Sequence, residues 1–308
     1  MHTPHLTITH DWFRIELTYT SNAIEGNTLS RRETALVVEK GLTVGGKSLI
    51  EHLEAVNHAY ALDWVKDKIS HNPQNISEKD ILLIHDMILK GIDDSNAGQY
   101  RNVAVRISGS TVILPNSLKV PDLMFDFMNY LNNSFDLHPI ELASEAHYRL
   151  VTIHPFVDGN GRTARLLMNM ILLMQGYPPA IIRKQDRLAY ITSLEKSQLG
   201  GSKSDYFRII ANAVDRSLNI YIKSIKGDIE NQSALLKIGE LCKESGENSS
   251  TIRHWTKEGL LDVSDITESG YQLYSRDMID RIKHINFLKK KRFTLKEIRD
   301  KILNNLSV

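Results

Sequence analysis

Residues 153–165 read IHPFVDGNGRTAR and lead directly into the apolar segment 166–174. Pro155 disfavours helical geometry at the residue before it, so a helix that precedes this stretch should end at His154. The apolar segment that follows is typical of a helix that packs in a core. The stretch therefore predicts a loop between two packed helices, around which the rest of the chain is organised.

The same loop carries the residues of a phosphate site. Gly159 and Gly161 have no Cβ, so the N–H groups of the loop can turn inward as an anion nest at the start of the next helix. Arg162 and Arg165 are three residues apart, so both guanidinium groups lie on one helix face and can reach the same ligand. Asp158 is a candidate ligand for Mg²⁺, which combines few carboxylates with phosphate oxygens.

A histidine stands just before this phosphate site. His154 is placed to accept a proton from an incoming hydroxyl, as a general base does. Positioning and charge neutralisation would supply the rest of catalysis, as in other phosphoryl transfers. Each residue alone is more often structural than catalytic, but packing alone does not explain their combination in one loop.

Composition describes a globular chain and gives few hints of a partner. The chain has 308 residues, 42% of them hydrophobic, which suffices for one large or two ordinary domains, and its net charge is +1. The single cysteine, Cys242, excludes an internal disulfide and favours a reducing compartment, so we expect a cytoplasmic location. We expect no signal peptide and no partner membrane, because no stretch approaches the roughly 20 apolar residues of a membrane helix.

Hydrophobic periodicity and capping residues predict a mainly helical first part. The expected helices cover residues 11–24, 33–40, 51–68, 77–90, 121–132, 139–153, 162–175, 186–198 and 204–225. Ser77 is an expected N-cap, and His147 is expected to be a hydrogen-bonded core histidine. Asp11 should cap the first helix and Gly26 should end it. Glu25 then lies at the negative end of the helix dipole, which disfavours an acid by roughly 0.3–1 kcal/mol, so we expect a cationic partner elsewhere in the fold.

Residues 41–48, GLTVGGKS, match the fixed positions of a nucleotide-binding phosphate loop. Such a loop must follow a buried strand, whereas the capping box at Ser30 predicts a helix that ends near Gly41. The chain also lacks the alternating strands and helices of an α/β sheet. The context favours a glycine-rich loop between helices, and a Walker site is the minor alternative.

Residues 103–114, VAVRISGSTVIL, are rich in β-branched side chains and predict a β-hairpin about a turn at residues 108–110. A lone hairpin is only marginally stable by itself, so it should lie on the helical body with one edge free to receive an extended peptide. The alternative is a structural flap that binds nothing.

The loop HPFVDGNGRTAR resembles the signature of the Fic family, whose members mostly transfer AMP from ATP to a hydroxyl side chain of a target protein. The likeness extends over residues 10–225 and includes the segment GQYR at 98–101. It implies a mainly α fold, namely a helical bundle with a β-hairpin flap, with ATP as substrate and Mg²⁺ as cofactor. By this resemblance His154 is the general base and Asp158 the Mg²⁺ ligand. The implied nucleotide contacts are Gly159, Asn160, Gly161, Arg162 and Arg165, with Asn160 at the α-phosphate.

The expected hairpin resembles the flap of that family, which registers the target chain beside the nucleotide. The implied docking residues are Ile107, Ser108, Gly109, Ser110 and Thr111. Residues 21–26, SNAIEG, are similar to the family's inhibitory motif S/T-x-x-x-E-G, whose glutamate pairs with the second arginine of the loop. The resemblance therefore implies a self-inhibited enzyme in which Ser21 and Glu25 act on Arg165. In some relatives the same glutamate supports removal of AMP, and this alternative stays open.

The C-terminal part reads as helix, turn, helix and a small wing, after an expected linker at 226–234. It resembles the DNA-binding domain of the MerR family over residues 237–303. By this resemblance the segment 249–255 faces the major groove, with 289–292 near phosphates. The DNA-binding candidates are Ser249, Ser250, Thr251, Arg253 and His254. Gln272 replaces the basic residue usual in the wing, and the long dimerising helix is missing, so a protein-binding or degenerate module is the alternative unless the Fic part forms a homodimer.

The sequence thus predicts a mainly α protein of two domains, at 1–230 and 235–308. The first is expected to be a Fic-like AMP transferase with an N-terminal inhibitory helix, and the second a winged helix-turn-helix. The expected partners are an unidentified target protein and duplex DNA. Two rival interpretations remain: a transcription regulator whose Fic part senses nucleotide, modifies itself or removes AMP, and transfer of another phosphate-containing group.

Overall fold

The computed structural model describes residues 4–71, 76–225, 235–267, 270–291, 293–295 and 297–299. These residues are mainly helical, with one small antiparallel sheet, which confirms the predicted fold class. The chain divides into two compact units, Met1–Ile225 and Lys226–Val308, and each is described by itself. The expected linker at 226–234, and Arg292 among the expected phosphate contacts, lie outside the described residues. None of the described helices combines the length and the apolar character needed to cross a membrane.

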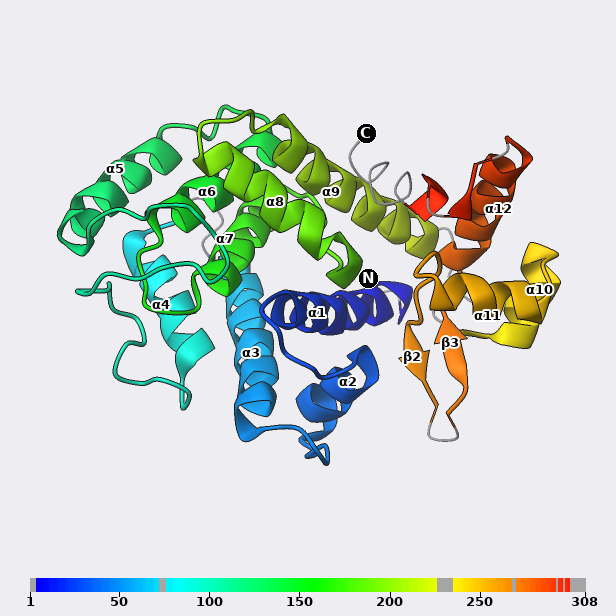
Figure 1. Ribbon diagram of the computed structural model, residues 1–308. Helices are drawn as coiled ribbons and strands as arrows, with labels where there is room; N and C mark the ends of the chain where they lie inside the picture. Colours follow the sequence, from blue (N-terminus) through cyan, green and yellow to red (C-terminus); the bar gives the residue numbers. More distant parts are fainter. Residues whose placement is uncertain are drawn as a thin grey trace. The chain divides into compact units, whose positions relative to one another are not determined.

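The first unit is a bundle of helices, coloured from blue to yellow-green in Figure 1. Its α-helices are α1 (Pro4–Ile24), α2 (Arg31–Lys40), α3 (Leu49–His71), α4 (Glu78–Leu89), α5 (Val120–Asn132), α6 (Pro139–Ile153), α7 (Asn160–Met174), α8 (Arg187–Gln198) and α9 (Ser204–Ile225). Two 3₁₀ turns, Ser117–Lys119 and Lys184–Asp186, precede α5 and α8. Asp11 does not cap α1, because the helix already begins at Pro4, a residue whose fixed φ suits a first turn.

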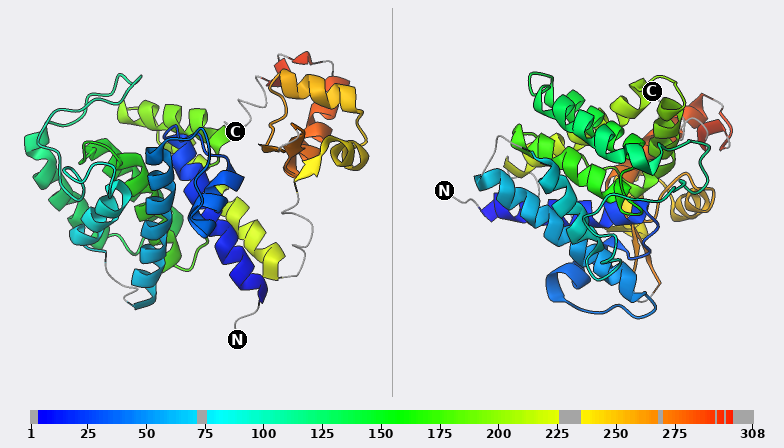
Figure 2. Two further views of the ribbon diagram at one scale, coloured as in Figure 1. Left: turned by 90° about the horizontal axis from the view of Figure 1, so that it is seen from below. Right: turned by 90° about the vertical axis from the view of Figure 1, so that its left-hand side faces the viewer.

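Helix α7 forms the centre of this unit. It packs against α1, α3, α4 and α6, and every residue from 164 to 172 is buried. In Figure 1, α7 lies among these helices, and the left view of Figure 2 shows α1 running alongside α9. A helix that is apolar on all sides can be stable only in such a core. The loop at its N-terminus is therefore anchored by the most buried element of the fold.

Residues 41–48 form a loop between α2 and α3, as the context predicted. Gly41 ends α2 in the left-handed conformation, with φ at 62°. The Lys47 ammonium donates to the backbone carbonyl of Thr28 at 2.7 Å and lies 3.9 Å from a carboxylate oxygen of Glu33. No strand precedes this loop in the described part of the chain, so the Walker alternative finds no support.

The β-hairpin predicted for residues 103–114 does not form: the segment is a loop of two arms with no strand. Its tip is a turn in which the Ser110 N–H donates to the carbonyl of Ile107 at 3.2 Å. Arg101 joins the bases of the arms, because its guanidinium donates to the carbonyls of Val103 (3.0 Å) and Pro115 (2.7 Å). One side chain thus takes the place of the expected cross-strand ladder. We keep the name flap for residues 103–114.

The second unit has its own core and the expected helix-turn-helix with a wing. Its elements are β1 (Leu236–Lys237), α10 (Ile238–Ser245), α11 (Ser249–Lys257), β2 (Asp265–Ile266), β3 (Gln272–Tyr274) and α12 (Asp277–Lys290). The sheet order is β1-β3-β2, antiparallel throughout. Trp255 and Tyr274 are buried in this core. Gly246 ends α10 with φ at 74°, which makes the tight turn before α11.

Candidate nucleotide and active site

His154 stands between the two central helices in an unusual backbone conformation. Helix α6 ends at Ile153 as predicted, and His154 caps it with φ at 52° and ψ at 60°. It is the one non-glycine residue with positive φ in the described part of the chain. Arg101 holds the turn: its Nε donates to the His154 carbonyl at 2.7 Å, and its backbone N–H donates to the Pro155 carbonyl at 2.9 Å. Such strain persists only where the surroundings fix it, as Arg101 does here.

The His154 ring is suited to accept a proton. Its Nδ1 lies 3.2 Å from the carbonyl of Val151, which can only accept, so Nδ1 carries the proton and Nε2 keeps a lone pair. Burial lowers the His154 pKa from its ordinary value, against the opposing effect of the Val151 hydrogen bond. The imidazole is therefore neutral at pH 7, which is the form that a general base needs.

The side chain of Asn160 holds the loop from Phe156 to Gly159. The Asn160 amide accepts from the Phe156 N–H and donates to the Phe156 carbonyl, both at 3.0 Å. Its expected phosphate contact stays a prediction, since both ends of the amide are engaged with the loop here. Gly159 starts α7 with φ at 75°.

The residue that the patterns missed is His85 on α4. Its Nδ1 accepts from the Gly98 N–H at 3.0 Å, and its Nε2–H donates to the Asp158 carbonyl at 3.0 Å. The ring stacks on Phe156 with centroids 3.7 Å apart. A Cβ on Gly159 would come within 3.2 Å of this ring, so the close approach requires glycine. Burial lowers the pKa of His85 to about 4, so the ring links the GQYR segment to the loop in its neutral form.

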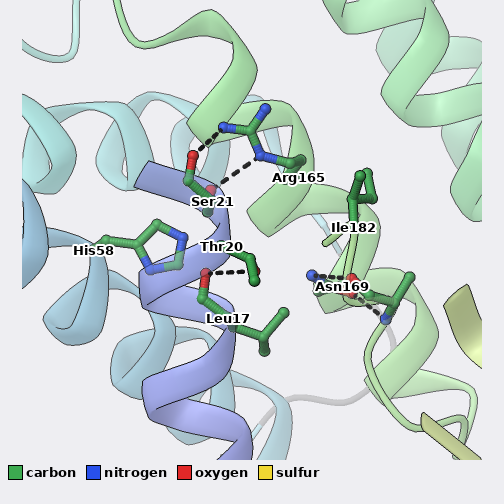
Figure 3. Close-up of a pocket in the computed structure, with 8 residues that line it drawn as sticks. Leu17, Thr20, Ser21, His58, Arg165, Asn169 and Ile182 are labelled. Atoms are coloured by element: carbon green, nitrogen blue, oxygen red, sulfur yellow. Dashed lines mark hydrogen bonds between the residues drawn. The ribbon is translucent and has the colours of Figure 1, made fainter. Parts of the chain in front are cut away.

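The second arginine of the loop, Arg165, contacts the residues of the expected inhibitory motif. Arg165 is 4% exposed, and its guanidinium donates to a Glu25 carboxylate oxygen at 2.6 Å. It also donates to the Ser21 hydroxyl at 3.0 Å and to the Ser21 carbonyl at 2.9 Å (Figure 3). A Cβ on Gly161 would collide with the same Glu25 oxygen. The carboxylate therefore lies at the N-terminus of α7, where the helix dipole and exposed N–H groups favour an anion.

The first arginine also pairs with carboxylates of the chain. Arg162 is 2% exposed and donates to Glu54 on α3 at 2.8 Å and to Asp158 at 3.0 Å. The Glu54 contact was not apparent from sequence, because a glutamate in a helix without a motif gives no signal. The Asp158 side chain is 68% exposed. The described residues contain no cluster of three or more metal-ligating side chains, and the role of Asp158 as an Mg²⁺ ligand stays a prediction.

A small cavity lies beside Arg165, lined by side chains of α1, α3 and α7 (Figure 3). Its volume is about 10 Å³, which suits roughly one water molecule and no nucleotide. His58 lines it and lies 3.2 Å from the Thr18 hydroxyl. Burial, together with the nearby Arg165 and Arg162, lowers the His58 pKa to about 3, so His58 adds no positive charge beside the two arginines.

A buried chain of hydrogen bonds approaches Arg165 from α6, α8 and α9. Tyr206 donates to the Ser144 carbonyl at 3.0 Å, so its oxygen must accept from His147 Nδ1–H at 2.8 Å. His147 Nε2 then accepts from the Tyr190 hydroxyl at 2.8 Å, which leaves the Tyr190 oxygen as an acceptor for Arg165. This confirms His147 as a hydrogen-bonded core histidine, whose pKa burial lowers to about 3.

The tip of the flap is fastened to α8 by one carboxylate. Glu195 Oε1 accepts from the Ser110 hydroxyl at 2.8 Å and from the Thr111 N–H and hydroxyl at 3.0 and 3.4 Å. These hydrogen bonds lower the Glu195 pKa. Ser110 and Thr111 are two of the five docking residues expected from sequence, so the structure ties the flap to the body where a target chain is expected to lie.

In the second unit α11 presents polar side chains outward. Arg253 and His254 are exposed, whereas Ile252 and Trp255 are buried in the core. Asn248 caps the helix by accepting from the Thr251 N–H at 2.8 Å. A groove of about 380 Å³ lies along this helix; it is lined by Ser250, Thr251, His254, Trp255, Lys289 and Leu295.

Two family matches and a curated relative agree with this description. Residues 75–172 match the Fic/DOC family, and residues 236–304 match the MerR HTH family of regulatory proteins. A protein adenylyltransferase Fic of Nematostella vectensis is 40% identical over 206 residues, which make up 67% of this chain and 48% of that relative. The chain therefore spans about half the length of the curated relative that it matches.

Two solved structures share the fold of the first unit. Fic-1 of C. elegans (residues 134–508) is 35% identical with a TM-score of 0.68, and the match covers 74% of this chain and 68% of that one. A Fic domain containing signaling protein from Bacteroides thetaiotaomicron is 32% identical with a TM-score of 0.64, and the match covers 72% of this chain and 90% of that one.

Proposed function

Because this chain belongs to the Fic family, we propose that it is a self-inhibited protein adenylyltransferase, which transfers AMP from ATP to a hydroxyl side chain of a target protein. One observation carries the proposal: the Glu25 carboxylate occupies the anion site at the N-terminus of α7, next to a neutral His154. An internal anion in that position implies that an external one, a nucleotide phosphate, binds there when Glu25 leaves.

The residues of the loop divide the chemistry between them. The N–H groups of residues 159–161 and the guanidinium groups of Arg162 and Arg165 bind the phosphates of ATP. His154 Nε2 takes the proton of the target hydroxyl as its oxygen bonds to the α-phosphorus, and the bond to the β-phosphate breaks to release pyrophosphate. Asp158 would hold Mg²⁺, which neutralises phosphate charge when bound. The flap orients the target chain beside the nucleotide.

Inhibition follows from competition for Arg165. As long as Glu25 holds the guanidinium, the phosphates of ATP meet a carboxylate in place of a cation. A closed state favoured by about 3 kcal/mol hides activity by roughly 100-fold. Substitution of Glu25 by glycine removes this competitor and leaves His154 and both arginines in place. We therefore expect AMP transfer to rise by roughly 100-fold.

The experiment compares three proteins with labelled ATP and Mg²⁺, using mass analysis to detect AMP on the protein itself or on proteins of a lysate. Glu25→Gly should gain the mass of one AMP, the wild type should gain much less, and Glu25→Gly with His154→Ala should gain none. Equal low transfer by all three, with ATP and Mg²⁺ saturating, would falsify the proposal. If the double variant still gained the mass of AMP, a residue other than His154 would be the general base.

A second function is favoured by the exposed polar face of α11. We propose that Arg253 and His254 contact duplex DNA, with Lys289 near a phosphate. Phosphate contacts release counterions, so the affinity for DNA should fall steeply between 50 and 200 mM salt. Arg253→Ala should weaken binding and reduce the salt slope by about one. A flat salt response would argue for a protein-binding module instead.

A further inference from the structure

The inhibitory segment, residues 21–27, has a second connection to the arginine pair besides its glutamate. The amide of Asn27 donates to Glu54 Oε2 at 2.9 Å and to the Glu51 carbonyl at 3.0 Å. The other oxygen of Glu54 accepts from Arg162 at 2.8 Å. A continuous path of hydrogen bonds therefore leads from Asn27 through Glu54 to the first arginine of the loop.

The two ion pairs differ in how easily they can open. The side chain of Glu25 is 37% exposed, so its carboxylate can exchange Arg165 for water. The side chain of Glu54 is 17% exposed and both of its oxygens are engaged. Removal of one partner from a buried ion pair is strongly unfavourable, because the other charge stays buried and uncompensated. The pair of Glu54 and Arg162 is thus built to persist when Glu25 leaves.

We propose that Asn27 and Glu54 are positioning residues of the active site: Asn27 fixes the Glu54 carboxylate, which in turn aims Arg162 at the nucleotide. The inference rests on the proposed function, in which Arg162 binds ATP. The inhibitory segment then has two opposed roles. Glu25 withholds Arg165 from ATP, whereas Asn27, two residues further along, supports the other arginine in the closed and open states alike.

The test uses the full chain with Glu25→Gly as background and measures the Kd of ATP with Mg²⁺ by calorimetry. Asn27→Asp keeps the oxygen that accepts from the Leu29 N–H at 2.9 Å, but replaces the donating amide by a charge that repels Glu54. Loss of a hydrogen bond to a charged group should weaken ATP binding by roughly tenfold or more. Glu54→Gln should act in the same direction and carries the test if Asn27→Asp does not fold.

The matched control is Asn22→Ala. This amide belongs to the same segment but donates to the backbone carbonyl of Glu54 at 3.2 Å, not to its carboxylate. We expect the ATP Kd of this variant to stay within about twofold of the Glu25→Gly value. That change is smaller than the change caused by loss of one hydrogen bond to a charged group. A merely structural role would instead lower the unfolding temperature of Asn27→Asp and Asn22→Ala alike, without a selective loss of ATP affinity.

Unchanged ATP binding in the Asn27 and Glu54 variants would overturn the inference. Tighter binding would overturn it too, because Glu54 would then be a second inhibitor. Failure of the proposed function looks different: Glu25→Gly would bind ATP and transfer no AMP, and the comparison of Kd values among the variants would still decide the role of Asn27.

Discussion

The carboxylate of Glu25 and the guanidinium of Arg165 meet at 2.6 Å, although 140 residues separate them in the chain. The pair joins the residue that follows the C-terminal end of α1 to the second turn of α7. The contact is favourable for both helix dipoles, because the carboxylate lies away from the negative C-terminal end of α1 and at the positive N-terminal end of α7.

The pH dependence of transfer should report His154. Burial lowers its pKa below the ordinary histidine value, so the neutral, active form is already present at mildly acidic pH. In Glu25→Gly, kcat should rise with pH to a plateau whose midpoint lies below about 6.5. Steady-state rates from pH 5 to 8 at saturating ATP would measure this. A midpoint above that pH would contradict either the role of His154 as the base or the burial that lowers its pKa.

The stability of the protein should fall in acid because of three buried neutral histidines. The folded-state pKa is about 3 for His58 and His147 and about 4 for His85, whereas unfolded histidine has a value of about 6.5. Below pH 6.5 the unfolded chain therefore binds more protons than the folded one, and each histidine contributes a loss of up to about 1.4 kcal/mol per pH unit. Chemical unfolding between pH 7 and 5 should show this slope, and His147→Gln should reduce it. Stability that does not change over this range would contradict the neutral state of these rings.

Tyr190 should support ATP binding through Arg165. Its oxygen is left as an acceptor by the hydrogen bond that its hydroxyl donates to His147. In the Glu25→Gly background, Tyr190→Phe should raise the KM for ATP by roughly tenfold, the effect of one hydrogen bond to a charged group. Tyr148→Phe is the matched control, since that hydroxyl donates to the Ser197 carbonyl outside this chain of hydrogen bonds. Equal KM values for the two variants would show that Tyr190 does not support ATP binding.

Release of the flap tip should make residues 103–114 more accessible to proteases without changing ATP binding. Glu195→Ala removes the acceptor shared by Ser110 and Thr111. Proteolytic cleavage within residues 103–114 should become severalfold faster, while ATP binding in the Glu25→Gly background stays the same. Limited proteolysis followed by mass analysis measures the first effect, and calorimetry the second. Unchanged cleavage would show that other contacts hold the flap.

Local sequence features predicted most of the helices correctly. The capping box at Ser30, the N-cap at Ser77 and the end of α6 before Pro155 lie where the pattern placed them, because caps and prolines act on their immediate neighbours. The β-branched residues of the flap predicted a hairpin, and this was wrong. Strand pairing depends on which groups satisfy the backbone, and Arg101, which lies outside the β-branched run, does so here.

The sequence by itself predicted the loop between two packed helices, proposed His154 as its base, and indicated that Glu25 needs a cation, since each follows from residues that are neighbours along the chain. The family resemblance of residues 21–26 named Arg165 as that cation, and the structure shows the pair. Only the tertiary structure decided that Glu54 faces Arg162. No sequence pattern indicates that Glu54 and His85 contact the loop, and these contacts form only because α3 and α4 pack against α7. Contacts between distant segments depend on how helices pack in three dimensions, and no local pattern encodes the partner of a single buried charge.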